Sequence, residues 1–263
     1  MSFCRASLFG LAAIMLALTS IGTNARAERL IASVSNHRVT ITPNYAGEQL
    51  VLFGSIEKDA TTPATRAPYD VIVTVAGPRA TIVTRRKERV LGIWINTDSR
   101  QFENVPRYLA VFSTRPFAAV ASEDALRRLQ IGLDNVILTQ RVGPDFADVV
   151  PTDPFRSAFV RIKADHQLYR EQPNGVTLLT PTLFRTNIAL AAEAPIGTYK
   201  VSLVVVSGGQ VVARGETAFE VVKIGFEQFV AENAQSHGYL YGLFTVAMAL
   251  LTGWLASVIF RRD

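Results

Sequence analysis

The chain has 263 residues and a formal net charge of +5 at pH 7, of which Arg5, Arg26 and the tail Arg261-Arg262-Asp263 together contribute three. The segment between these ends is too weakly basic to indicate nucleic-acid binding. The single cysteine, Cys4, lies near the N-terminus, so the rest of the chain can form neither a disulfide nor a thiol nucleophile.

Residues 1–27 have the pattern of a secretory signal. Arg5 precedes an apolar run, and Ala25-Arg26-Ala27 supplies a small-x-small cleavage site. We expect cleavage before Glu28. An uncleaved N-terminal anchor is the alternative, and it would leave the rest of the chain on the same side of a membrane.

Residues 28–118 contain short runs rich in Val, Ile, Thr and aromatic residues, separated by turn residues such as Gly77-Pro78. This pattern is typical of antiparallel strands in a sandwich. We predict a first β-sandwich-like lobe here, with strands at Leu30–Ser35, Arg38–Thr42, Gln49–Ile56, Tyr69–Val75, Thr81–Arg86, Val90–Ile95 and Tyr108–Ser113.

Residues 119–172 form a predicted helical segment. Ser122 is a suitable N-cap for one helix, and Asp153-Pro154 combines an acidic cap with proline at the first helical position of a second. Gly143 to Thr152 has the composition of a loop. His166 falls on the apolar stripe of the second helix, and we interpret it as a packed, hydrogen-bonded histidine rather than a ligand.

Residues 173–223 return to a strand pattern, with strands expected at Val176–Leu179, Leu183–Leu190, Tyr199–Val206 and Gln210–Val222. The Gly197-Thr198-Tyr199 entry resembles the tyrosine corner of immunoglobulin-like sandwiches. Ser207-Gly208-Gly209 predicts a hairpin. We therefore expect a mainly β fold: immunoglobulin-like antiparallel sandwich lobes with a helical insertion. Two lobes are favoured over one split sandwich.

The C-terminal residues predict a membrane anchor. Residues 224–237 read as an amphipathic juxtamembrane stretch, and the 22 residues Tyr239 to Phe260 carry no charge. At about 1.5 Å per residue they span a ~30 Å hydrocarbon core, so we predict one transmembrane helix over 238–260. Arg261 and Arg262 in the tail 261–263 mark the cytoplasmic side, which places the rest of the chain in the periplasm.

Two groups of residues are candidate contact sites. Ala249, Gly253 and Ser257 fall four apart and form a candidate helix-packing face, although such stripes also arise by chance. The run of Arg85, Arg86, Lys87 and Arg89 is a candidate patch for an acidic partner or lipid headgroups. The favoured interpretation of this run is a solvated hairpin turn whose charges discourage strand-edge association.

The sequence contains no nucleophile elbow, phosphate-binding loop, dinucleotide fingerprint or zincin motif, and no histidine pair at metal-ligand spacing. We expect no enzyme, no cofactor and no metal. A catalytic triad assembled from distant residues is the alternative, since triads are defined by geometry.

Six blocks of the sequence carry a resemblance to a known family: Arg85–Trp94, Arg128–Asn135, Pro173–Thr177, Thr180–Arg185, Gly225–Phe229 and Gly253–Ser257. They resemble an uncharacterised family of predicted transmembrane proteins from alphaproteobacteria. The resemblance implies an inner-membrane protein of unknown activity, and the association of that family with sulfite-exporter-like permeases implies a transporter partner.

Our hypothesis is a periplasmic accessory protein, held in the inner membrane by a single pass with its C-terminus in the cytoplasm, that supports a membrane-protein partner. A periplasmic solute-binding or sensor module is the alternative from another class. A pocket between lobes or under the helices would favour it. A hydrolase is a third and weaker hypothesis.

Overall fold

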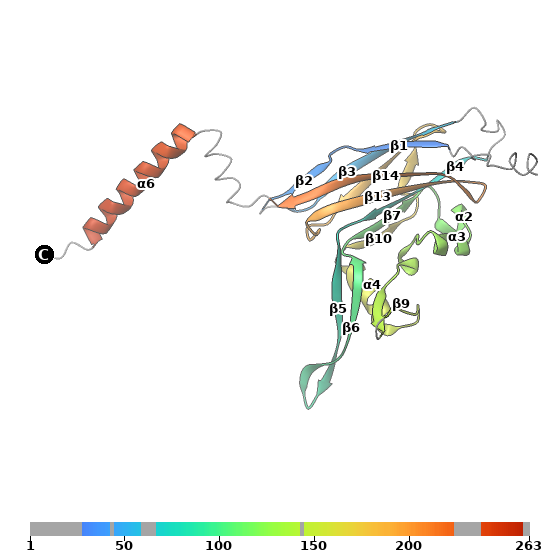
Figure 1. Ribbon diagram of the computed structural model, residues 1–263, viewed down its shortest axis with the longest axis horizontal. Helices are drawn as coiled ribbons and strands as arrows, with labels where there is room; N and C mark the ends of the chain where they lie inside the picture. The colour runs from blue at the N-terminus through green and yellow to red at the C-terminus, as the bar shows by residue number, and fades with distance from the viewer. Residues whose placement is uncertain (1–27, 43–44, 59–66, 143–144, 224–237, 260–263) are drawn as a thin grey trace, which may run out of the picture.

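A computed structural model describes residues 28–42, 45–58, 67–142, 145–223 and 238–259. Its strands form three sheets, two of which face each other across a shared apolar core, while the third carries a long hairpin that projects away from them (Figure 1). The mainly β character predicted from the sequence is confirmed for the described residues.

The smaller sheet of the sandwich has the strand order β1-β3-β12-β11, and all its pairs are antiparallel. Side chains alternate along its central strands, as expected when one face is packed and the other solvated. Leu50 and Leu52 of β3 and Phe184 and Ile188 of β12 are fully buried. The strands are β1 (Arg29–Val34), β3 (Glu48–Glu57), β11 (Val176–Leu178) and β12 (Leu183–Leu190).

The larger sheet of the sandwich has the order β10-β7-β4-β13-β14-β2. Its edge pairs β10–β7 and β14–β2 are parallel, which departs from the purely antiparallel sandwich that we predicted. The strands are β2 (Arg38–Ile41), β4 (Tyr69–Ala76), β7 (Leu109–Ser113), β10 (Tyr169–Gln172), β13 (Gly197–Ser207) and β14 (Gln210–Lys223).

The strands of residues 28–118 and 173–223 are interleaved in both sheets of the sandwich. β3 pairs with β12, β4 with β13, and β2 with β14. The preference for two lobes is therefore wrong, and the chain forms one split sandwich. The predicted helical segment 119–172 is inserted into it, except that its last four residues form β10 of the larger sheet. The physical reason is that β3 and β4 hydrogen-bond along strands that only the later segment supplies, so neither segment completes its sheets alone.

The predicted tyrosine corner is confirmed. The Tyr199 hydroxyl donates a hydrogen bond to the backbone carbonyl of Pro195 at 2.7 Å. The buried Tyr199 ring stacks on Phe219, with 4.9 Å between centroids, and meets Tyr108 edge-on at 5.4 Å. The predicted hairpin at residues 207–209 is also present, with positive φ at both glycines.

Short helices fill the insertion, and both predicted N-caps are confirmed. Ser122 Oγ accepts from the Ala125 N–H at 3.3 Å, and an Asp153 carboxylate oxygen accepts from the Phe155 N–H at 2.7 Å. The helices are α2 (Phe117–Val120), α3 (Glu123–Arg128), the 3₁₀ turn η1 (Leu133–Asn135) and α4 (Pro154–Asp165).

The third sheet has the order β5-β6-β8-β9. Its first two strands form the long hairpin, and the short strand β9 lies where we predicted only a loop. The strands are β5 (Arg79–Val90), β6 (Ile93–Pro106), β8 (Thr139–Val142) and β9 (Asp145–Asp148). The hairpin points down from the sandwich in Figure 1.

Helix α6 (Gly238–Ile259) follows the sandwich in the chain. Taken over the described residues, no helix has the combination of length and apolar character that a membrane span requires. The prediction of a transmembrane helix over 238–260 is therefore wrong. The predicted signal (1–27), the juxtamembrane stretch (224–237), and Arg261 and Arg262 lie outside the described residues.

Candidate functional site

The end of the β5–β6 hairpin is a two-residue turn made by Leu91 and Gly92. Both have positive φ, +51° and +91°, which is the geometry of a type I′ turn. Glycine suits this geometry at Gly92. The position of Leu91 is normally occupied by Gly, which lacks a Cβ, or by Asn or Asp, whose short polar side chains hydrogen-bond locally, whereas leucine is strained there. The Leu91 side chain is 100% exposed. Packing within the fold therefore does not explain the leucine.

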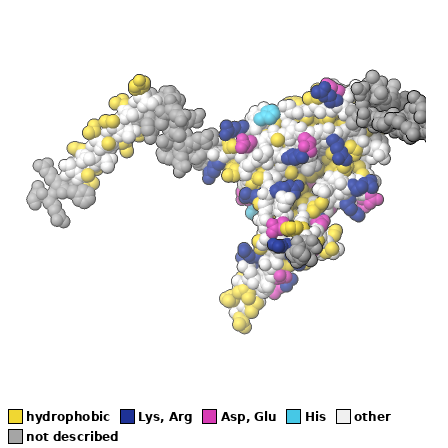
Figure 2. Space-filling view, viewed as in Figure 1, with side chains coloured by type: hydrophobic (Ala, Val, Ile, Leu, Met, Phe, Trp, Pro, Cys, Tyr) yellow, Lys and Arg dark blue, Asp and Glu magenta, His cyan; other side chains and the backbone are white. Residues whose placement is uncertain are grey.

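The side chains next to this turn are also apolar and exposed. Ile93 and Trp94 are 64% and 69% exposed. The lower end of the molecule, where the β5–β6 hairpin ends, is covered by hydrophobic side chains in Figure 2. Large apolar side chains gathered at one exposed point mark an interaction site more often than scattered ones do. We define the hairpin tip as Val90, Leu91, Ile93, Trp94 and Ile95.

The basic run lies on strand β5, so its predicted position in a turn is wrong. Because side chains alternate across a strand, Arg85, Lys87 and Arg89 lie on one face of the hairpin. Arg89 is paired in register with Trp94, so that Trp94 shares this face. We call this side the basic face.

Arg86 and Glu88 lie on the opposite face of the hairpin. Arg86 Nη2 pairs with Glu88 Oε1 at 2.8 Å, so the one acidic residue in the run neutralises the cation beside it. Val90, Ile93 and Ile95 continue this face towards the tip by strand alternation and register. The two faces thus differ: Arg85, Lys87 and Arg89 lie on one, and the paired Arg86 and Glu88 lie on the other with the apolar residues that follow them.

The base of the hairpin is fixed to the rest of the domain by Arg100 and Phe102. Arg100 hydrogen-bonds Gln140 Oε1 at 2.9 Å, pairs with Asp153 Oδ2 at 3.4 Å, and lies over the Phe155 ring at 5.4 Å from its centroid. Phe102 is fully buried. Its ring contacts that of Phe159 in α4 edge-on at 5.4 Å. The base is thus held by charge, hydrogen bonding and packing.

Arg156 ties helix α4 to the segment that precedes it. Its guanidinium is buried and donates to the carbonyls of Val149 at 3.1 Å, Asp134 at 3.0 Å and Val136 at 2.5 Å. It also contacts an Asp148 carboxylate oxygen at 3.4 Å. A buried guanidinium is stable only when its donors are satisfied in this way. Residues 134–142 and 145–149 are therefore held in place beside the hairpin base.

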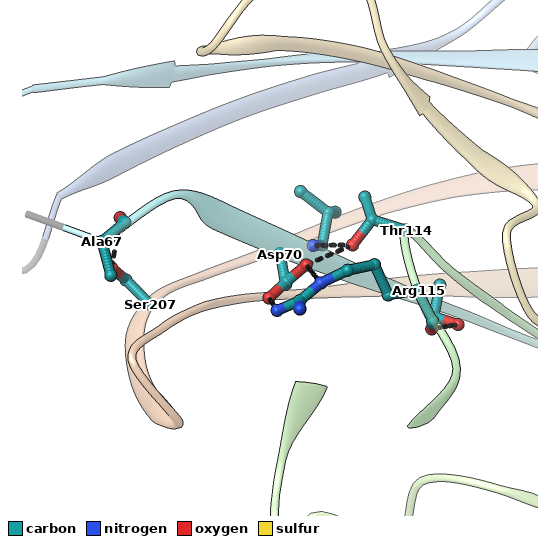
Figure 3. A network of polar contacts seen from close by, with 7 residues as sticks. Ala67, Asp70, Thr114, Arg115 and Ser207 are labelled. Carbon is teal, nitrogen blue, oxygen red and sulfur yellow. Dashed lines mark hydrogen bonds and ion pairs between the residues drawn. The ribbon is translucent and has the colours of Figure 1, made fainter. Parts of the chain in front are cut away.

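A second candidate lies at the other end of the sandwich, where Asp70, Thr114 and Arg115 meet (Figure 3). Arg115 donates two hydrogen bonds to the Asp70 carboxylate, one from Nε at 2.8 Å and one from Nη2. Thr114 Oγ1 donates to the same carboxylate at 2.9 Å. Burial would raise the pKa of Asp70, but the hydrogen bonds and charge of Arg115, with help from Thr114, hold it below its ordinary value.

An open hollow of about 590 Å³ lies beside this ion pair. Asp70 and Arg115 line it together with the start of β4, α2 and the Gly208-Gly209 turn. Ser207 Oγ closes one side by donating to the Ala67 carbonyl at 2.8 Å (Figure 3). The charged groups of the hollow are directed at one another, so their first role is to join β4 to the end of β7.

The candidate helix-packing face on α6 stays a prediction. Ala249, Gly253 and Ser257 are all exposed, and the structure brings no other described part of the chain against them. A Cβ added at Gly253 would meet nothing within 4 Å, so the face is open to an approaching surface.

His166 agrees with its prediction only in part. It is hydrogen-bonded, with Nδ1 3.0 Å from Glu193 Oε2. It is not packed, since its side chain is half-exposed at the residue that follows α4. No group of three or more metal-binding side chains occurs among the described residues.

Sequence reasoning missed the apolar hairpin tip and the fixed base at Arg100. The strand predicted over Val90–Ile95 is wrong, because the chain turns at Leu91-Gly92. The tip had a usable signal, since Leu91-Gly92 has the length of a two-residue hairpin turn between apolar, strand-forming residues. The anchoring of the base had none, since Arg100, Gln140 and Asp153 are far apart in the sequence.

Comparison with known proteins gives one family. The model of a family described as "Putative transmembrane protein (Alph_Pro_TM)" matches residues 29–262. No curated protein matches the chain significantly. Among solved structures, the N-terminal domain of the Streptococcus gordonii adhesin Sgo0707 is similar over 74% of this chain and 32% of that chain, with 6% identity and a TM-score of 0.29. The chain thus spans about a third of that structure, and a likeness of this size carries no argument.

Proposed function

The chain belongs to this alphaproteobacterial family, and on that premise we propose that it is a non-enzymatic interaction protein of the cell envelope that works at a membrane. The hairpin carries this proposal. An apolar tip is held in the exposed position by a base that is itself fixed to helix α4 and its N-cap Asp153. Exposed apolar groups are unfavourable in water, so the arrangement is expected to serve a partner.

The signal-like N-terminus supports a location in the periplasm, and the family description supports association with a membrane. We place the domain on the periplasmic side of the inner membrane. The sequence blocks that resemble this family also support a particular partner, because the resemblance implies an association with an inner-membrane transporter of the sulfite-exporter-like permease kind. Two surfaces would contact this partner: the part of the β5–β6 hairpin between its tip and its base, which we call the shaft, and the open face of α6.

Photo-crosslinking in living cells tests the hairpin contact. A benzoylphenylalanine at Asn96, on the exposed shaft, should give an adduct with a membrane protein. The same group at Arg214, an exposed residue of strand β14, should give none. Identical adducts from both positions, or none from Asn96, would contradict a contact through the hairpin.

Co-purification tests the helix face. Gly253→Ile should reduce recovery of the partner, because the added side chain prevents close approach at this position. Leu251→Ile is the matched control, since it changes a side chain on the opposite side of α6. Equal recovery with both variants would argue against the helix contact.

A solute-binding or sensor module is the second candidate function, and the hollow beside Asp70 and Arg115 favours it. The Arg115 side chain is 56% exposed, so a small anion could approach the guanidinium. A ligand that prefers the folded state raises the melting temperature. Thermal-shift measurements with oxyanions should show a concentration-dependent rise for a binder that is lost in Arg115→Gln, and no rise for a scaffold.

A further inference from the structure

We propose that the hairpin tip inserts into the surface of an anionic lipid bilayer. This inference rests on the proposed function, because it names what the end of that interaction element touches. The tip chemistry is suitable: three aliphatic residues and Trp94 surround a fully exposed leucine. Tryptophan is enriched where the apolar and polar regions of a bilayer meet, since its ring is apolar and its N–H is polar.

The geometry of the tip favours a bilayer over a protein surface. Trp94 lies on one face of the hairpin, Val90 and Ile93 lie on the other, and Leu91 lies at the end. A flat protein surface could cover only one of these sides. A fluid apolar phase surrounds all of them at once, as it does the apolar face of an interfacial helix.

The cations of the basic face lie at the depth that headgroups would occupy. Arg89 adjoins the tip, and Lys87 and Arg85 follow at about 7 Å and 14 Å further up the strand, at ~3.4 Å per residue. A tip buried by about 5–10 Å would bring Arg89 and Lys87 to the headgroup layer. Arg89 Nε is held near the turn by the Gly92 carbonyl at 3.2 Å.

The charge of this face points to anionic lipid. Arg85 and Lys87 form no ion pair within the described residues, whereas Arg86 on the other face is paired with Glu88. Basic groups near a membrane surface are attracted to anionic headgroups, and this attraction weakens as salt is added. Binding should therefore require both the apolar tip and the basic face.

Trp94 itself is the probe for the test. The chain has two tryptophans, so Trp254→Phe leaves Trp94 as the single one in the full-length protein. We expect its emission to shift to shorter wavelength and to be quenched by brominated lipids in vesicles containing phosphatidylglycerol. Vesicles of phosphatidylcholine alone should quench it much less. The signal is local, so it reports the tip whatever else in the chain contacts the vesicle.

Two pairs of variants separate the contribution of the apolar tip from that of the basic face. Leu91→Asn suits the type I′ turn, so the hairpin remains folded while the tip loses apolar surface, and quenching should fall. Ile196→Asn, at a residue 53% exposed on the sandwich, should leave quenching unchanged.

The double variant Arg85→Gln/Lys87→Gln should lower the affinity for anionic vesicles about tenfold or more. Arg127→Gln/Arg214→Gln removes two charges elsewhere and should not.

The outcomes are distinct. Unquenched Trp94 in both kinds of vesicle, or full quenching in Leu91→Asn, would overturn lipid insertion. Equal quenching in both kinds of vesicle would overturn the requirement for anionic lipid. Loss of insertion with a persisting crosslink from Asn96 would leave the proposed function standing. Insertion without any crosslink would support the lipid contact and count against the protein partner.

Discussion

The ring of Phe184 in β12 lies directly over the backbone of Gly54 in the neighbouring strand β3, where the two residues are paired in register. A Cβ at Gly54 would overlap this ring. The glycine thus allows a large aromatic side chain to fill the sandwich core next to a strand that would otherwise exclude it.

Gly54→Ala is therefore expected to destabilise the domain by about 1–3 kcal/mol, because overpacking forces the ring or the strand to shift. Urea denaturation of the full-length protein measures the change. In a Phe184→Leu background the cost should be smaller, since the ring is gone. A cost that stays the same in both backgrounds would show that the contact is not its cause.

Tyr199→Phe should cost about 1–3 kcal/mol, because it removes the buried donor to the Pro195 carbonyl and leaves the ring in place. The midpoint of urea unfolding is the measurement. Tyr239→Phe provides the same chemical change at a side chain that is 99% exposed, and should be neutral. Equal effects of the two substitutions would argue against a stabilising tyrosine corner.

Arg115→Gln should raise the pKa of Asp70. Burial raises this pKa, and in the native protein the hydrogen bonds of Arg115 and Thr114 outweigh it. A carboxyl with a depressed folded-state pKa stabilises the protein above its unfolded value, near 3.8, and this contribution is lost as pH falls through the folded-state pKa. Stability of the native chain and the variant should thus differ at neutral pH and converge in acid.

The carbon NMR titration of the Asp70 carboxyl checks this directly. Arg161→Gln, on the exposed surface of α4, is the control and should leave the Asp70 titration unchanged. An unchanged Asp70 titration in Arg115→Gln would mean that Thr114, rather than Arg115, sets the pKa of Asp70.

Arg156→Met should destabilise the domain by about 2–4 kcal/mol, because the Val149, Asp134 and Val136 carbonyls lose their donor. Hydrogen exchange should become faster in residues 134–142 and 145–149 before the sandwich opens. Arg161→Met, on the exposed face of the same helix, should leave exchange unchanged. Faster exchange spread evenly over the sandwich would refute a local role.

Leu91→Asn should stabilise the hairpin turn by up to about 1 kcal/mol, since asparagine tolerates positive φ better than leucine. Slower hydrogen exchange of the amides near the turn measures this effect. Leu91→Val is the opposite control, because a β-branched residue is strained further there. If Asn and Val gave equal exchange, the backbone geometry at Leu91 would not matter.

Local patterns predicted most of the individual strands. The alternation of Leu50 and Leu52 and the caps at Ser122 and Asp153 are properties of short segments, and the structure has them where the sequence indicates. The tyrosine corner at Tyr199 was recognisable for the same reason, since its hydrogen bond spans four residues.

The pairing between strands that are far apart in the chain could not be predicted from local sequence patterns. Whether Leu183–Leu190 pairs with β3 or with a strand of its own lobe depends on register across more than a hundred residues, and one-sided alternation is compatible with both. The basic run was misplaced because Arg85 to Arg89 looks like a turn by composition. Its partners in β6 make it a strand.

The pairing of β2 with β14 has a consequence for biogenesis. One edge of the larger sheet joins residues 38–41 to residues 220–223, so the second strand of the domain is adjacent to the last one. A nascent chain cannot close this edge until nearly the whole domain has been made. Early termination anywhere before Gln210 would leave β13 and β2 without β14, and such fragments should be cleared by proteolysis rather than accumulate as a stable half-domain.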